Sequence, residues 1–112
     1  MHSPKRIAIL SEDSNVFTGI KNILEQHHLA SFFTIKSASD INKKDYHLID
    51  LWIIDFNKTS EQFAKENNIF HIFPYIFFIN EIFPDEAYLP KAIFQTPLNL
   101  FQQKQFIIFL KN

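Results

Sequence analysis

Residues 50–55 read Asp50-Leu51-Trp52-Ile53-Ile54-Asp55, a short apolar run that ends in a carboxylate. Because the apolar residues occupy both alternating sets of positions, the pattern predicts a strand over residues 48–56 that is buried on both faces. A second apolar run, residues 6–10, is followed by Ser11, Glu12 and Asp13. Parallel strands place their carboxyl ends at one edge of a sheet, so Glu12, Asp13 and Asp55 are expected to gather there.

The other apolar segments alternate between strand and helix patterns. Further strands are predicted over residues 30–36, 72–79 and 91–96, and helices over residues 16–27, 61–67 and 99–111. Residues 37–47 are polar, and Pro84 and Pro90 leave no room for a full helix in residues 81–91. The alternation predicts an α/β fold: a three-layer, doubly wound, parallel five-stranded sheet with reduced third and fourth helices.

Composition excludes several classes of function. The 112 residues suit a single domain spanning residues 1–112, and the formal net charge of −1 argues against a nucleic-acid or membrane surface. No cysteine is present, which excludes disulfides and thiolate chemistry. Gly19 is the only glycine, so no glycine-rich loop can hold the phosphates of a nucleotide. A cytoplasmic location is the expectation, because no apolar run approaches the length of a membrane helix.

In their order along the chain, these segments resemble the receiver domain of bacterial response regulators. Residues 9–13 resemble the family's acidic-pair segment, and residues 50–55 resemble the strand that ends in its phosphorylated aspartate. Residues 74–80 and 93–98 resemble the fourth and fifth strands. The resemblance implies a flavodoxin-like fold with Asp55 at the phosphoacceptor position. It also implies that Glu12, Asp13 and Asp55 are the candidate ligands of a Mg²⁺ ion.

Two positions depart from the family's pattern. Where the family has a Ser or Thr hydroxyl at the end of the fourth strand, this chain has Ile79, and where it has a Lys before the Pro after the fifth strand, this chain has Thr96. Phosphorylation adds about two negative charges, which neither Ile79 nor Thr96 can neutralise. By sequence, Lys58 and Lys91 are the only nearby cations. The departures predict a degenerate pseudo-receiver in which Asp55 is inactive.

The predicted last helix is apolar around more than one face. Its interface candidates are Phe101, Phe106, Phe109 and Leu110. A surface helix keeps a polar side, so part of this apolar area is expected to meet a partner or a second copy. The alternative is that the phenylalanine-rich composition has only widened the face that packs on the sheet.

The leading hypothesis is an atypical receiver-like signalling domain of two-component signal transduction. It acts by protein–protein contact or homodimerisation, without phosphorylation, enzymatic activity or a cofactor, and forms all or the N-terminal part of a regulator, such as one of transcription. One alternative is a phosphorelay receiver in which Asp55 accepts phosphate with Mg²⁺. The other is a flavodoxin-like small-molecule binder.

Overall fold

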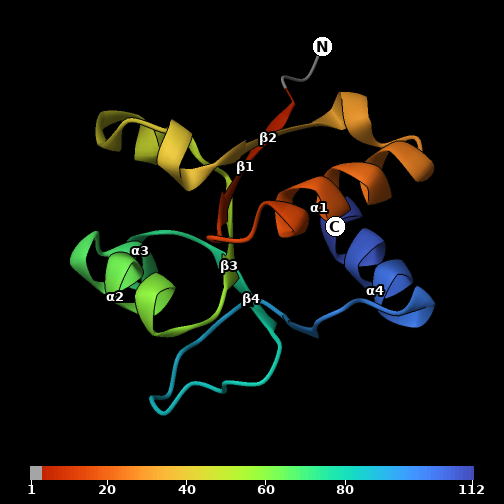
Figure 1. The fold of residues 1–112 in the computed structure, drawn as a ribbon. Helices are drawn as coiled ribbons and strands as arrows, with labels where there is room; N and C mark the ends of the chain where they lie inside the picture. Colours follow the sequence, from red (N-terminus) through yellow and green to blue (C-terminus); the bar gives the residue numbers. More distant parts are fainter. Residues whose placement is uncertain (1–3) are drawn as a thin grey trace.

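The computed structural model describes residues 4–112, which form a sheet of five parallel strands (Figure 1). The strands are β1 (Lys5–Leu10), β2 (Phe33–Ser37), β3 (Leu51–Asp55), β4 (Tyr75–Ile79) and β5 (Ile93–Gln95). Their order across the sheet is β2-β1-β3-β4-β5. The predicted parallel sheet is therefore confirmed, and β3, which was predicted to be buried on both faces, is its central strand.

Helices cover both faces of the sheet, which confirms the three-layer arrangement. In Figure 1, α1 (Ser14–Gln26) and α4 (Leu100–Lys111) lie on one side, and α2 (Lys58–Glu66) and α3 (Ile69–Ile72) lie on the other. All five residues of β4 are buried. Because side chains alternate along a strand, Phe78 packs in the core beneath α1 and α4, whereas Phe77 packs in the core beneath α2 and α3.

Two of the connections lack a regular α-helix. Between β2 and β3 the chain makes the 3₁₀ turns Ala38–Asp40 and Lys43–Leu48. Between β4 and β5, residues 80–92 contain no helix, as Pro84 and Pro90 predicted. Helix α2, which follows β3, is short: it ends at Glu66 with Asn67 as its C-cap, and Asn68 takes a left-handed conformation with a φ of 56°. Asparagine tolerates the left-handed region better than most residues, and here Asn68 occupies the position after the helix that glycine often takes.

Four predicted strands begin two or three residues too early: they were expected from residues 30, 48, 72 and 91, whereas β2, β3, β4 and β5 begin at residues 33, 51, 75 and 93. Residues 69–72 form the single turn α3, and β4 starts only at Tyr75, after Pro74. Likewise, Ala30–Phe32 is a 3₁₀ turn that precedes β2. At residues 30 and 72 the error has the same cause: short apolar runs do not distinguish a strand from a turn packed on the core.

The β4–β5 loop, residues 80–92, is held against α2. The Tyr88 hydroxyl donates a hydrogen bond to Oε2 of Glu61, a carboxylate that is only 7% exposed. Lys58 and Lys65 of α2 form ion pairs with Asp85 and Glu86 of the loop. The Tyr88 ring stacks on Phe70 at a centroid distance of 4.4 Å. The loop is thus held against α2 and α3 by side-chain contacts.

The exposed face of α4 differs from the predicted one. Phe106 is fully buried and Leu110 is 5% exposed, so neither is available to a partner, and these two interface predictions are wrong. Phe109 is half-buried and its ring lies 6.3 Å from that of Phe94. Phe101 remains on the surface, at 68% exposed.

Candidate functional site

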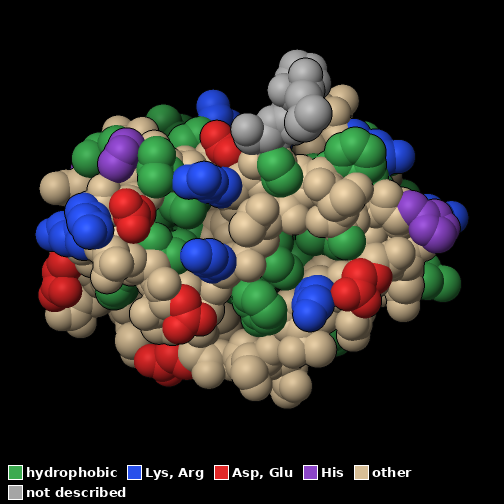
Figure 2. All heavy atoms as spheres, turned by 90° about the horizontal axis from the view of Figure 1, so that it is seen from above, with side chains coloured by type: hydrophobic (Ala, Val, Ile, Leu, Met, Phe, Trp, Pro, Cys, Tyr) green, Lys and Arg blue, Asp and Glu red, His purple; other side chains and the backbone are tan. Residues whose placement is uncertain are grey.

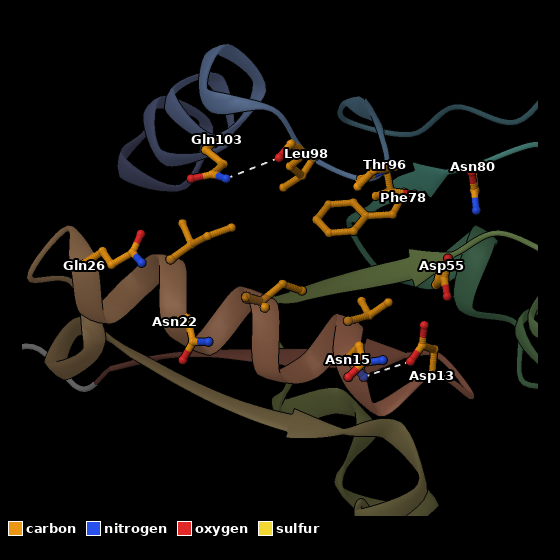
Figure 3. Close-up of a pocket in the computed structure, with 15 residues that line it drawn as sticks. Asp13, Asn15, Asn22, Gln26, Asp55, Phe78, Asn80, Thr96, Leu98 and Gln103 are labelled. Carbon is orange, nitrogen blue, oxygen red and sulfur yellow. Dashed lines mark hydrogen bonds between the residues drawn. The ribbon is translucent and has the colours of Figure 1, made fainter.

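Asp55 ends β3 at the carboxyl edge of the sheet, where its half-buried side chain lines a pocket of about 460 Å³. We call this the Asp55 pocket; it is lined by α1, the ends of β3 and β4, residues 96–98 and Gln103 of α4. Asp13 lines the same pocket and caps α1, since its Oδ1 accepts a hydrogen bond from the backbone N of Asn15 at 2.9 Å. Figure 3 shows both carboxylates at one end of the pocket.

The backbone at Asp55 is fixed from two sides. The N–H of Phe56 donates to the carbonyl oxygen of Phe78 at 2.8 Å, which joins the end of β3 to β4. The Ser60 hydroxyl donates to the carbonyl oxygen of Asp55 at 2.8 Å. Ser60 also belongs to the capping box with which Asn57 begins α2. The position of the Asp55 side chain therefore follows from the sheet and from the start of α2.

Glu12 does not join Asp13 and Asp55. Its exposed side chain lines a separate hollow with Ser11, Ser37 and Thr59, between β1, β2 and α2. The backbone of Asp13 is extended, with φ −95° and ψ 110°, and neighbouring side chains point to opposite sides of an extended chain. Within residues 4–112, no three His, Asp or Glu side chains lie close enough together to hold a metal ion.

Ser11 is a site residue that the sequence reasoning missed. Its hydroxyl donates a hydrogen bond to Oδ2 of Asp55 at 2.7 Å and accepts one from the backbone N of Asp13 at 3.0 Å. The strand register explains its position, because Leu10 of β1 pairs with Ile54 of β3 and the next residues are Ser11 and Asp55. The β1–α1 loop thus presents a hydroxyl to Asp55.

The two positions that depart from the receiver pattern, Ile79 and Thr96, lie in different parts of the structure. Ile79 is 1% exposed and packs in the core beneath α2 and α3. Thr96 lines the Asp55 pocket, and its backbone N donates to the carbonyl oxygen of Ile79 at 2.8 Å. Asn80 lies beside Asp55 at the same end of the pocket (Figure 3). The groups that face Asp55 across the pocket are therefore uncharged.

Neither lysine that the sequence suggested replaces the missing cation. Lys58 forms ion pairs with Asp85 at 3.2 Å and Glu61 at 3.7 Å. Lys91 lines a different pocket, with Lys5, near the amino ends of the strands. Among the described residues, no lysine or arginine lines the Asp55 pocket. A phosphoryl group on Asp55 would lie near a second negative charge, the carboxylate of Asp13, and would meet no positively charged side chain in the pocket.

No protein-family model matches the sequence, and no curated protein matches it either. Solved structures do resemble it. The signal receiver domain of a protein described as a LuxO repressor, from Vibrio parahaemolyticus, has a TM-score of 0.62 at 12% identity, covering 95% of this chain and 88% of that one. A CheY-like response regulator from Mesorhizobium loti has a TM-score of 0.59 at 13% identity, covering 96% and 97%.

SdrG from Sphingomonas melonis has a TM-score of 0.55 at 13% identity, with full coverage of both chains. The neighbours share with this chain a fold that extends over nearly its whole length. The fold is therefore that of response regulator receiver domains, a CheY-like, flavodoxin-type arrangement, as the resemblance implied.

Proposed function

We propose that this chain is a receiver-type signalling domain of two-component regulation that acts through protein–protein contact, without phosphorylation of Asp55. The observation that carries the proposal is that, among the described residues, no cationic side chain lines the Asp55 pocket. A phosphoryl group adds about two negative charges, and each charged hydrogen-bond partner missing from its site is worth roughly 1.5–3 kcal/mol. The pocket offers Thr96 and Asn80 there, and Asp13 adds repulsion.

Beryllofluoride with Mg²⁺, which mimics an aspartyl phosphate, tests the inactivity of Asp55. We expect no saturable change in the amide resonances of residues 11–15 and 55–60, because the pocket cannot neutralise the added charge. The measurement is an NMR titration of the wild type, with Asp55→Asn as the matched control. Saturable changes that Asp55→Asn abolishes would establish the alternative, a phosphorylatable receiver that binds Mg²⁺.

We propose a second copy of this chain as the partner, bound through α4 and β5. Four large apolar side chains on β5 and α4 are more than half exposed: Ile93, Leu100, Phe101 and Ile108. A hollow between β5 and α4 is lined by Ile93, Phe101 and Ile108 and by no charged residue. An isologous contact places each such surface against its own copy, so the absence of charge removes the like-charge repulsion that would oppose it.

Phe101→Asp is expected to shift the protein from dimer to monomer, because it places a charge at the centre of the apolar contact. Size-exclusion chromatography with light scattering measures the mass. Phe32→Asp is the matched control, since Phe32 is 61% exposed and precedes β2, which lies at the opposite edge of the sheet from β5. A wild type that stays monomeric at high concentration would refute dimerisation through this surface.

The proposal includes no direct contact with nucleic acid or membrane and a cytoplasmic location. In the face seen in Figure 2, lysine and arginine side chains are interspersed with acidic ones and form no basic patch. No helix within residues 4–112 combines the length and the apolar character needed to cross a bilayer. The domain is proposed to be non-enzymatic, with any output supplied by its partner.

A further inference from the structure

We infer that the Asp55 pocket binds a small organic cation, with its ammonium or amidinium group at Asp13 and Asp55 and an apolar body lying between α1 and α4. The inference goes beyond protein–protein contact and names a ligand class. It rests on the proposed function in one respect, because Asp55 must remain a free carboxylate.

The shape of the pocket suits an elongated ligand. Figure 3 shows it running along α1, from Asp13 and Asp55 at one end to Gln26 at the other, with α4 above. Between these ends the lining is largely apolar and includes Ile20, Ile23 and Phe78. Its volume of about 460 Å³ is within the range of pockets that hold small molecules. An apolar body would therefore lie on the core, with a polar group at the sheet edge.

The charge of the pocket selects the sign of the ligand. Asp13 and Asp55 are its only charged lining residues, and the other polar ones are amides and a hydroxyl. Each carboxylate accepts one hydrogen bond within the described chain: Asp13 at Oδ1 from the backbone N–H of Asn15, and Asp55 at Oδ2 from the Ser11 hydroxyl. The second oxygen of each is left to accept from a ligand. An anion would be repelled, whereas an ammonium or amidinium group would form charge-assisted hydrogen bonds.

Gly19 supplies an independent argument, because neither backbone nor packing requires a glycine there. It lies inside α1 without a positive φ, and a Cβ built on it meets no atom within 4 Å. Helical spacing puts it in one stripe with Asn15, Asn22 and Gln26, which also line the pocket. A glycine weakens a helix interior. Here its missing side chain leaves the groove open along α1.

The test is an NMR titration of the ¹⁵N-labelled protein with 2-phenylethylammonium, without Mg²⁺ or any phosphoryl donor. Gly19 gives the only glycine amide signal, so its shift reports the pocket without ambiguity. We expect saturable shifts of Gly19 and of the side-chain amides of Asn22 and Asn80. The anion 3-phenylpropanoate, of similar shape, is expected to leave these signals unchanged.

Gly19→Leu fills the groove and should abolish the shifts of Asn22 and Asn80. Thr18→Leu is the matched control, because it adds the same side chain at an exposed position of α1 outside the pocket. Asp55→Asn, which is close to isosteric, should weaken binding at least about tenfold through loss of a charged hydrogen bond. Circular dichroism verifies that each variant is folded.

Three outcomes overturn the inference: no shift through the millimolar range, equal binding of 3-phenylpropanoate, or unchanged binding by both Gly19→Leu and Asp55→Asn. The beryllofluoride titration is a separate measurement. A failure of amine binding therefore leaves the inactivity of Asp55 standing, and the amine titration, which contains no phosphoryl donor, is read independently of the beryllofluoride result.

Discussion

Phe106→Ala is expected to lower the free energy of unfolding by about 3–5 kcal/mol, the usual cost of truncating a buried phenylalanine. Phe106 is fully buried, and its ring meets Phe78 and Phe94 edge to face, each at a centroid distance of 5.5 Å. Removing it leaves a cavity between α4, β4 and β5, which neighbouring rings cannot fill without leaving their own contacts. Urea denaturation followed by circular dichroism measures the change.

Phe101→Ala on the same helix is the matched control. Because Phe101 is 68% exposed, its truncation should change the free energy of unfolding by no more than about 0.5 kcal/mol. The same variant should weaken the proposed dimer, so it is compared at a concentration at which the wild type is monomeric. Equal destabilisation by the two substitutions would show that α4 is rotated relative to the arrangement described above.

Tyr88→Phe is expected to cost roughly 1.5–3 kcal/mol, the range for a hydrogen bond to a charged group. The change removes the only hydrogen bond that a side chain among the described residues donates to the buried Glu61 carboxylate, since Lys58 forms only an ion pair with it, at 3.7 Å. It should also loosen the β4–β5 loop, which hydrogen exchange of residues 80–92 would report. Tyr46→Phe is the control, because the Tyr46 hydroxyl makes no hydrogen bond among residues 4–112 and its loss should matter less.

The same contact predicts a loss of stability in alkali. Burial, followed by the hydrogen bond to Glu61, raises the pKa of Tyr88 from 10.0 to about 12. The unfolded chain therefore loses this proton first, so the contribution of Tyr88 is complete below pH 10 and disappears as the pH rises through about 12. Burial also raises the pKa of Tyr46 and Tyr75. Denaturation midpoints of the wild type should fall more steeply above pH 10 than those of Tyr88→Phe; parallel profiles would contradict this assignment.

The α/β alternation is a local property, and the sequence predicted it well. Short apolar runs separated by amphipathic segments determine a parallel sheet wrapped by helices, and Pro84 and Pro90 exclude a regular helix before β5. The predicted strand boundaries near Ala30 and Ile72 were wrong because a short apolar turn and the start of an apolar strand have the same sequence pattern. Contact with the rest of the core decides between them.

The candidate site was predicted only in part. Asp13 and Asp55 come together as their strands implied, whereas Glu12 lies on the other side of the loop and Ser11 takes the place beside Asp55. Glu12 and Asp13 are neighbours on an extended segment, so their side chains point to opposite sides, and the pairing of Leu10 with Ile54 puts Ser11 beside Asp55. Sequence spacing does not specify the register of strands that lie more than forty residues apart, because the pairing depends on how both strands pack.

By itself, the sequence determined the order of strands and helices and the chemistry available to the site, since Ile79 and Thr96 lack a hydroxyl donor and a positive charge respectively whatever the fold. Only the tertiary structure decided which carboxylates meet, that Phe106 packs inside while Phe101 stays outside, and that Gly19 borders an open groove. The physical reason is that the type of each side chain and the spacing of apolar residues are local properties of the chain. The rotation of a helix and the register of a strand are set by packing between segments distant in sequence.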